Sequence, residues 1–293
     1  MRLALYDDYR LGTVDTVARA ITPVAIDTEP HDPDPFGAGW WVRLCRDLTE
    51  GAKLSVIGEP LSLAGVTLRA PVLNPGKVIA AASNYGGHIA EMRDKVLPRS
   101  GVTGQAWLLD FDVFLKAPSS IVGPDDQIVL PRGVVAEGKQ IHHEGELAIV
   151  IGRGGHRIAE EDALGHVFGY LIGLDMTVRG NGDRSRRKSY PSFTPLGPWV
   201  TTLDDAGDWR ELSIELDVNG EVRQQVSCAD MLVSVPGIIV YASKVMTLEP
   251  GDVILTGAPP GVGPITDGDT VHVRIDRLGE LRLPVVTETV AGN

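Results

Sequence analysis

Long hydrophobic runs, cysteines and positive charge are all scarce in this sequence. No apolar run approaches the roughly 20 residues that a bilayer-spanning helix requires, so we expect no membrane partner. The N-terminal segment MRLALYDDYR lacks an apolar stretch between a basic region and a small-residue cleavage site, and we expect no secretory signal. The two cysteines, Cys45 and Cys228, form no metal-binding or redox spacing and no disulfide framework. This pattern is typical of a reduced, cytoplasmic protein.

The deficit of positive charge argues against a nucleic-acid partner. Lys and Arg total 27 against 39 Asp and Glu, which gives a formal net charge of −12. A nucleic-acid-binding face must instead be basic to displace phosphate counterions. The overall field would not steer an anionic substrate either, so a local group of cations or a metal must bind it. Basic residues do cluster in one segment, RGNGDRSRRK at 179–188.

Strand-like segments dominate the chain after its first 70 residues. Apolar runs of strand length, separated by Gly and Pro turns, are typical of a β-dominated α+β fold rather than a doubly wound sheet. Asn219-Gly220 predicts a two-residue hairpin turn, because both positions need a positive φ. Helices are expected at 159–169 and 236–248. The change of pattern predicts a small N-terminal domain at 1–70 and a catalytic domain at 71–293.

Three carboxylates have the pattern of a cation site. Glu144 and Glu146, in HHEGELAIV, are two residues apart at the start of a predicted strand, so their side chains share one face. Neighbouring carboxylates repel each other unless a cation or a proton lies between them. Asp175 lies in an otherwise apolar strand, where burial without a partner is costly. These oxygen ligands suit a hard cation such as Mg²⁺, although surface charges at a strand end and a turn cap are the alternative.

Other motifs in the chain are weaker. His142 and His143 could suggest zinc, but the sequence contains no HExxH and no Cys-x-x-Cys partner. GRGGHR lacks the third glycine and the acidic partner of a dinucleotide fingerprint, and LTGAPPGVG lacks the Lys-Ser/Thr ending of a phosphate loop. We therefore expect neither zinc nor a nucleotide cofactor.

The residues around the carboxylates resemble the fumarylacetoacetate hydrolase family. HHEGELAIVIGR is similar to its H-x-E-x-E metal strand, and the similarity continues in family order over roughly residues 75–285. The other matching segments are FLKAPSSIVGP, FGYLIGLDMTVR, KSYPSFTPLGPWV, VNGEVRQ, MTLEPGDVILTGAPPGVGP and DGDTVHVRIDRLGELRLPV. The resemblance is to small members such as acylpyruvate hydrolases and 2-hydroxyhepta-2,4-diene-1,7-dioate isomerases. It implies the mixed β-sandwich/roll core of that family, Mg²⁺ or Mn²⁺ on Glu144, Glu146 and Asp175, and a homodimer.

His88 and Glu91 form a second candidate group in SNYGGHIAEM. Three residues apart, they would share one face of a helix and could hydrogen-bond. A carboxylate that holds an imidazole raises its basicity, as a general base that activates water requires. A solvated helix face is the alternative, but the segment resembles the N-Y-x-x-H-x-x-E-M stretch of the family. Because Gly86 and Gly87 disfavour a rigid helix, we expect a lid that orders when ligand binds.

The resemblance also implies which residues contact the substrate. Arg179 and Lys188 match a family Arg and Lys that contact the substrate, and both offer cationic donors for a carboxylate or an enolate oxygen. Tyr85, Thr256 and Gly257 fall on family motifs near the substrate. The remaining arginines of the basic cluster, at 184, 186 and 187, are expected to be a solvated loop.

Two departures from the family concern the distal end of the substrate. Gly182 lies near the place of a family Gln, and Ser83 or Asn84 stands where larger members have a fourth carboxylate ligand. The resemblance therefore does not extend to the name-giving substrate. We expect the choice of reaction to depend on residues 96–105.

The sequence thus predicts a divalent-metal hydrolase that cleaves a C–C bond of an acylpyruvate, a small anionic 2,4-dioxo acid. His88, oriented by Glu91, would activate the attacking water, and the metal would stabilise the pyruvate enolate that leaves. The same site would also serve decarboxylation or tautomerisation of oxaloacetate, or isomerisation of an unsaturated 2-oxo diacid. A non-catalytic binding module is the third hypothesis, and the joint presence of triad, dyad and Lys188 argues against it.

Overall fold

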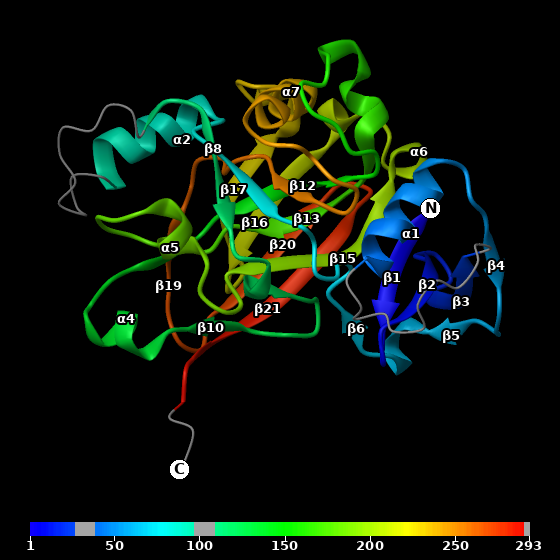
Figure 1. Cartoon of the computed structure of the whole chain (residues 1–293). Coiled ribbons are helices and arrows are strands. Elements are labelled where there is room, and N and C mark those ends of the chain that lie inside the picture. The colour runs from blue at the N-terminus through cyan, green and yellow to red at the C-terminus, as the bar shows by residue number, and fades with distance from the viewer. Residues whose placement is uncertain (27–38, 97–108, 290–293) are drawn as a thin grey trace.

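The structure, a computed structural model, describes residues 1–26, 39–96 and 109–289. Within these residues the chain forms three sheets joined by short helices (Figure 1). The predicted β-dominated α+β class is confirmed. None of the helices in the described ranges is long and apolar enough to cross a membrane.

The largest sheet has 13 strands among the described residues. Its main path runs β4-β3-β2-β1-β15-β13-β12-β18-β7-β8, while β5, β6 and β9 pair at its sides. In chain order the strands are β1 (Arg2–Tyr6), β2 (Arg10–Asp15), β3 (Ala20–Ile26), β4 (Leu54–Val56), β5 (Leu61–Ser62), β6 (Leu68–Arg69), β7 (Val78–Ala82), β8 (Asp112–Lys116), β9 (Ile121–Val122), β12 (Gly145–Ile151), β13 (Val167–Leu174), β15 (Thr194–Thr202) and β18 (Val253–Leu255).

Two smaller sheets complete the β structure. The five-stranded sheet runs β10 (Ile128–Leu130), β21 (Gly279–Thr287), β20 (Thr270–Ile275), β16 (Ser213–Val218) and β17 (Glu221–Ser227). The three-stranded sheet runs β14 (Thr177–Val178), β11 (Ile141–His143) and β19 (Gly263–Ile265). The predicted hairpin at Asn219-Gly220 joins β16 to β17, and both residues have a positive φ, as expected.

The α-helices of the described residues are short. They are α1 (Trp40–Thr49), α2 (Gly86–Glu91), α4 (Arg132–Ala136), α5 (Arg184–Lys188), α6 (Leu203–Ala206) and α7 (Val235–Val245). The helix expected at 236–248 is confirmed as α7, which begins after the Ser234 cap. The helix expected at 159–169 is wrong in type and length: Glu160–His166 forms 3₁₀ turns and β13 starts at Val167. Val167 and Phe168 are buried in the sheet, so tertiary packing overrides the local helical pattern.

Strand β12 lies between two hydrophobic cores. Leu147, Ile149 and Ile151 pack in the core that contains the inner face of the five-stranded sheet and α7. Ala148 and Val150 face the opposite way, into the core that contains α1 and β1. Because alternate residues of a strand point to opposite faces, both faces of β12 are covered by protein. The strand is therefore a rigid, solvent-free support for the residues at its start.

The N-terminal strands extend the large sheet rather than forming a separate one. β1 pairs with β15, with Leu3 opposite Val200. The Trp41 Nε1–H of α1 donates to the Gly251 carbonyl oxygen at 3.0 Å. In Figure 1 these blue elements lie beside β15, which pairs with β1 on one side and β13 on the other. The domain boundary at residue 70 stays a prediction, and a shared core packs across it.

Candidate active site

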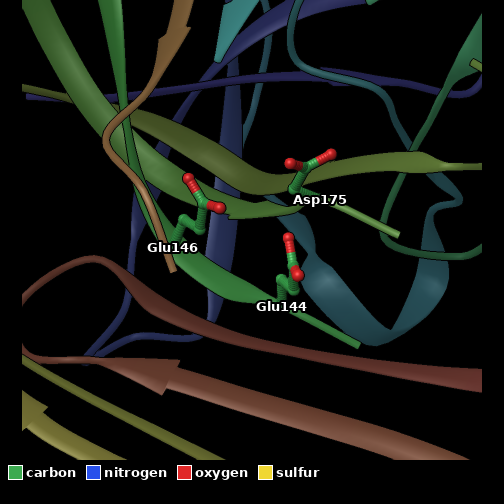
Figure 2. Close-up of side chains that lie close together, drawn as sticks. All are labelled: Glu144, Glu146 and Asp175. Atoms are coloured by element: carbon green, nitrogen blue, oxygen red, sulfur yellow. The ribbon is translucent and has the colours of Figure 1, made fainter. Parts of the chain in front are cut away.

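Three carboxylates converge where β12 begins and β13 ends. The antiparallel register places Gly145 opposite Leu174, and the Asp175 N–H donates to the Glu144 carbonyl oxygen at 2.8 Å. The chain at the two strand ends therefore brings Glu144, Glu146 and Asp175 together, and Figure 2 shows the three side chains close to one another. One ligand oxygen from each lies within 4.8 Å of the others. None of the three residues is more than 3% exposed.

Glu146 is the carboxylate whose charge is least compensated. Its Oε2 accepts the Gly257 N–H at 2.6 Å, but no Lys, Arg or His within the described ranges forms an ion pair with it. Burial, followed by the charges of Asp175 and Glu144, raises the pKa of Glu146 well above its ordinary value. The site therefore lacks positive charge at this position.

Glu144 is held by two of the predicted cations. Arg179 donates to Oε1 at 2.5 Å and Lys188 to Oε2 at 2.7 Å. Lys188 also contacts Asp175, so it bridges two of the three carboxylates. Burial works to raise the pKa of Glu144, but the charges of Lys188 and Arg179 outweigh it and hold this pKa well below its ordinary value. Glu144 is therefore an anion in the folded protein.

Lys116, which the sequence did not single out, holds the other side of Asp175. It is the last residue of β8, its side chain is fully buried, and its Nζ contacts Asp175 Oδ1 at 2.5 Å and the Phe193 carbonyl oxygen at 2.8 Å. Burial lowers its pKa, and the charge of Asp175 opposes this effect. The signal was present in FLKAP, where a lysine interrupts an apolar strand and needs a buried partner.

The donor set fits a divalent cation. All three ligands are oxygens, they are brought together by the sheet, and one of them has no cationic partner in the described structure. Hard cations such as Mg²⁺ and Mn²⁺ prefer such carboxylate oxygens. An ion beside Glu146 would relieve the repulsion that raises its pKa.

The two residues of the predicted dyad lie on α2 and face each other without a hydrogen bond. His88 is 8% exposed, and its Nδ1 faces Glu91 Oε2 at 3.8 Å, which is longer than a hydrogen bond. Glu91 Oε2 also accepts the Gly261 N–H at 2.9 Å. Burial opposes ionisation of Glu91, but His88 and the backbone N–H of Gly261 outweigh it and lower the pKa of Glu91. His88 in turn helps to lower the pKa of Glu144, so the dyad lies close to the carboxylates.

The loop after β18 supports both groups. Gly257 has φ +101°, and a Cβ at this position would lie 2.7 Å from the Cβ of Asn84, so only glycine fits there without strain. Thr256, also expected near the substrate, is fully buried and donates from Oγ1 to the Leu147 carbonyl oxygen at 2.9 Å. Asn84 donates to the Thr256 carbonyl oxygen at 2.8 Å. These contacts fix the Gly257 N–H that binds Glu146.

Gln224 joins this loop to the metal strand and was also missed from the sequence. It is fully buried on β17 and its Oε1 accepts the Gly145 N–H at 2.9 Å. Its Nε2 donates to the Pro259 carbonyl oxygen at 2.9 Å. One side chain thus sets the distance between the backbone that carries Glu144 and the loop that contacts Glu91. Gln224 lies in VNGEVRQ, and no local pattern in this segment indicates its role. The role is visible only in the structure, because the partners Gly145 and Pro259 are far from Gln224 in the sequence.

The structure places the remaining predicted residues less directly. Tyr85 is 1% exposed and packs in the hydrophobic core, where burial raises the pKa of its hydroxyl. Its contact with substrate stays a prediction, as do those of Arg179, Thr256 and Gly257. Gly86–Glu91 is helical despite its two glycines, and the expected lid behaviour is untested. Residues 96–105, which were expected to determine the choice of reaction, lie outside the described residues, apart from the backbone of residue 96.

Residues 77–286 match the family model described as "Fumarylacetoacetate (FAA) hydrolase C-terminal". The chain belongs to this family. A maleylpyruvate hydrolase of Aquipseudomonas alcaligenes is 36% identical over 288 residues, which cover 97% of this chain and 99% of the relative. An oxaloacetate tautomerase of Bacillus subtilis (strain 168) is 37% identical over 257 residues, covering 82% and 81% of the two chains.

Solved structures of the same family share the fold. A maleylpyruvate hydrolase from Sphingobium sp. SYK-6, in complex with manganese(II) and pyruvate, has a TM-score of 0.79 and 38% identity, and the match covers 99% of this chain and 100% of that one. A 5-carboxymethyl-2-hydroxymuconate delta-isomerase from Mycobacterium smegmatis has a TM-score of 0.74 and 33% identity, with 98% and 100% covered. The predicted family, its fold and its enzymatic class as a hydrolase are thereby confirmed.

Proposed function

We propose that this protein hydrolyses the C3–C4 bond of an acylpyruvate and releases pyruvate and a carboxylic acid. The observation that carries the proposal is the convergence of three buried carboxylates, one without a cationic partner in the described structure, beside the His88–Glu91 pair. The relatives named maleylpyruvate hydrolase support it. A divalent ion on Glu144, Glu146 and Asp175 supplies electrostatic stabilisation of the negative charge that develops on the 2-oxo group.

The chain's own residues supply the remaining chemistry. His88 removes a proton from water, which attacks the C4 carbonyl carbon, and Glu91 stabilises the imidazolium that forms. The C3–C4 bond then breaks, and the proton held by His88 passes to C3 of the departing pyruvate. Arg179 and Lys188 bring two positive charges to this site, where they attract the substrate carboxylate.

The dyad geometry is compatible with this role. Separations between catalytic groups are often long without substrate, and the Nδ1–Oε2 distance of 3.8 Å needs only a small approach to become a hydrogen bond. Because Glu91 is anchored to the Gly261 N–H, the approach would come from His88.

Tautomerisation of oxaloacetate is the second candidate, favoured by the tautomerase relative at 37% identity. It needs a base and the same stabilised 2-oxo group but no attacking water. One substrate panel separates the two: acylpyruvates of several lengths and oxaloacetate, each assayed with Mg²⁺, Mn²⁺ or EDTA. Metal-dependent release of pyruvate from acylpyruvates supports hydrolysis. Activity confined to oxaloacetate, or acylpyruvate hydrolysis that survives complete metal removal, would contradict it.

The finer properties follow from the same assignment. We propose Mg²⁺ or Mn²⁺ as the ion, a small anionic 2-oxo acid as the partner, and a homodimer located in the cytoplasm. Metal-dependent activity ranks the two ions, and light scattering coupled to gel filtration gives the mass of the assembly in solution. Elution at the mass of one chain, 31.4 kDa, would exclude the dimer.

A further inference from the structure

Asn84 is a fully buried amide just before the helix that carries the His88–Glu91 pair. Its exposed fraction is 0%, and only Tyr85 separates it from Gly86, the first residue of α2. A buried amide without hydrogen-bond partners is costly, so the partners of Asn84 show which parts of the protein it holds together.

The side chain of Asn84 joins two segments that are distant in the sequence. Its Oδ1 accepts the Val233 N–H at 2.7 Å, and its Nδ2 donates to the carbonyl oxygens of Val233 at 3.0 Å and Thr256 at 2.8 Å. The Leu232 N–H also donates to the backbone carbonyl oxygen of Asn84 at 2.9 Å. Because an amide nitrogen has two hydrogens, both donors of Asn84 are used by the backbone and neither is left for a substrate.

Val233 lies on a firmly held part of the molecule. The next residue, Ser234, is the N-cap of α7. This helix packs through Ile238 and Ile239 into the larger hydrophobic core, which also contains alternate residues of β12. The Val233 backbone therefore gives Asn84 a fixed attachment point on the same core that supports the metal-binding strand.

Thr256, the other partner, begins a loop that contacts α2 along its length. A Cβ at Gly87 would lie 2.9 Å from Pro260 Cγ, so this glycine lets the helix approach the loop closely. At the end of the helix, Glu91 accepts the Gly261 N–H at 2.9 Å. The loop at 256–262 is therefore the surface on which α2 rests.

We propose that Asn84 is a positioning residue that sets the place of His88 relative to the metal-binding carboxylates. Its bond to the Thr256 carbonyl fixes the backbone directly before Gly257, whose N–H binds Glu146 at 2.6 Å. The same amide fixes the start of α2, which carries His88. A change at Asn84 therefore moves the two groups relative to each other without removing either. This inference rests on the proposed function, in which His88 acts on a substrate held at the carboxylates.

The competing explanation is that Asn84 only stabilises the fold, and Ser243 provides the matched control. Ser243 is also fully buried, accepts the Ile158 N–H at 3.0 Å and donates to the Val240 carbonyl oxygen at 3.1 Å. These partners lie outside α2 and the loop at 256–262. Ser243→Ala should therefore lower the melting temperature and leave kcat unchanged.

Asn84→Asp and Asn84→Ala are the test variants. The aspartate has the same shape and keeps the acceptor for the Val233 N–H, but it loses both donors and places an oxygen against two carbonyl oxygens. The alanine loses all three side-chain bonds. Both should lower kcat for an acylpyruvate by about a hundredfold, the usual effect of misplacing catalytic groups by about 1 Å. KM and Mn²⁺ affinity should change far less, because sheet register continues to place the carboxylates.

Hydrogen exchange of the Mn²⁺-loaded proteins tests the anchoring of α2 independently of turnover. The amides of residues 86–91 should exchange faster in both Asn84 variants than in the wild type, whereas the amides of β12 and β13 should not. Ser243→Ala should leave the exchange of residues 86–91 unchanged.

Wild-type kcat in Asn84→Asp would overturn the assignment, because shape alone would then suffice. Equal losses of kcat in Ser243→Ala and the Asn84 variants, or unchanged exchange at residues 86–91, would also overturn it. Faster exchange at residues 86–91 in a protein that hydrolyses no acylpyruvate would reject the proposed reaction while supporting the anchoring of α2 by Asn84.

Discussion

The two halves of the candidate site are built differently. Glu144, Glu146 and Asp175 stand at the ends of central strands, are almost completely buried, and are fixed by sheet register. His88 and Glu91 stand on a six-residue helix that begins with two glycines, and their side chains are 3.8 Å apart. Glu91 is tied to the Gly261 N–H. We call the three carboxylates the rigid half and the His88–Glu91 pair the lightly held half. We propose that the rigid half determines what is bound, whereas the lightly held half adjusts to the ligand and determines the reaction.

The largest effect is expected from Glu146→Gln, which alters the rigid half. The amide keeps an acceptor for the Gly257 N–H but removes a charge that the ion requires. Turnover should fall by at least about a hundredfold, since a bound metal ion contributes several kcal/mol to transition-state stabilisation. The metal-free variant should melt at a higher temperature than the wild type, because one member of a repelling cluster is gone. Steady-state kinetics and calorimetry in EDTA measure the two effects; a lower melting temperature would contradict the electrostatic account.

His88→Ala tests the lightly held half. Loss of the general base should lower kcat by roughly 10² to 10⁴-fold while Mn²⁺ affinity stays within about twofold of wild type. Glu91→Gln should produce a smaller loss, because it acts through His88. Parallel kinetics and metal titrations on the same preparations check both. If His88→Ala lowers metal affinity and turnover equally, the proposal that the carboxylates bind the metal and His88 acts only in the reaction is contradicted.

Lys116→Met tests how strongly the rigid half is supported. Removing one partner of a buried ion pair leaves Asp175 Oδ1 without this cation and should cost about 3 to 5 kcal/mol of unfolding free energy in metal-free protein. Lys139→Met, which removes an exposed ion pair with Glu137, is the control and should cost less than about 1 kcal/mol. Urea unfolding in EDTA measures both. Equal effects from the two variants would show that the buried pair has no special structural role.

The smallest effect on turnover is expected from Gln224→Leu, which loosens the link between the two halves. It leaves the Gly145 N–H and the Pro259 carbonyl without their partner, at a cost of about 1 to 3 kcal/mol each at most. We expect kcat to fall by about tenfold with little change in metal affinity, because Glu144 and Asp175 keep their own partners. Gln225→Leu, its exposed neighbour, is the control. If metal affinity falls as much as kcat, Gln224 supports only the metal-binding carboxylates and does not link them to the His88–Glu91 pair.

Much of the rigid half could be predicted from the sequence, for physical reasons. The period of a strand predicts that Glu144 and Glu146 share one face, and an aspartate in the apolar segment around Asp175 signals a buried partner, although β13 ends one residue before Asp175. The identity of that partner could not be predicted. Lys116 lies 59 residues before Asp175, and the link from Gln224 to Gly145 spans 79 residues. Such contacts depend on how the sheets are arranged, which local patterns do not encode.

The lightly held half was less predictable. The spacing of His88 and Glu91 predicts that both lie on one face of a helix. Neither the 3.8 Å separation of their side chains nor the hydrogen bond from the Gly261 N–H to Glu91 follows from this spacing. The environments of the arginines in 179–188 were also invisible in the sequence, where they form one basic run. Only the packing of α5 against β8 separates Arg184 from Arg186. The helix expected at 159–169 failed for a related reason, since burial in β13 outweighs local propensity.

Direct Mn²⁺ titration, followed by electron paramagnetic resonance, tests the central claim most directly. The account predicts one tightly bound Mn²⁺ per wild-type chain, loss of this site in both Glu146→Gln and Asp175→Asn, and its retention in His88→Ala. A tightly bound ion that persists in Glu146→Gln and Asp175→Asn, or a wild-type chain that binds none, would contradict the assignment of the three carboxylates.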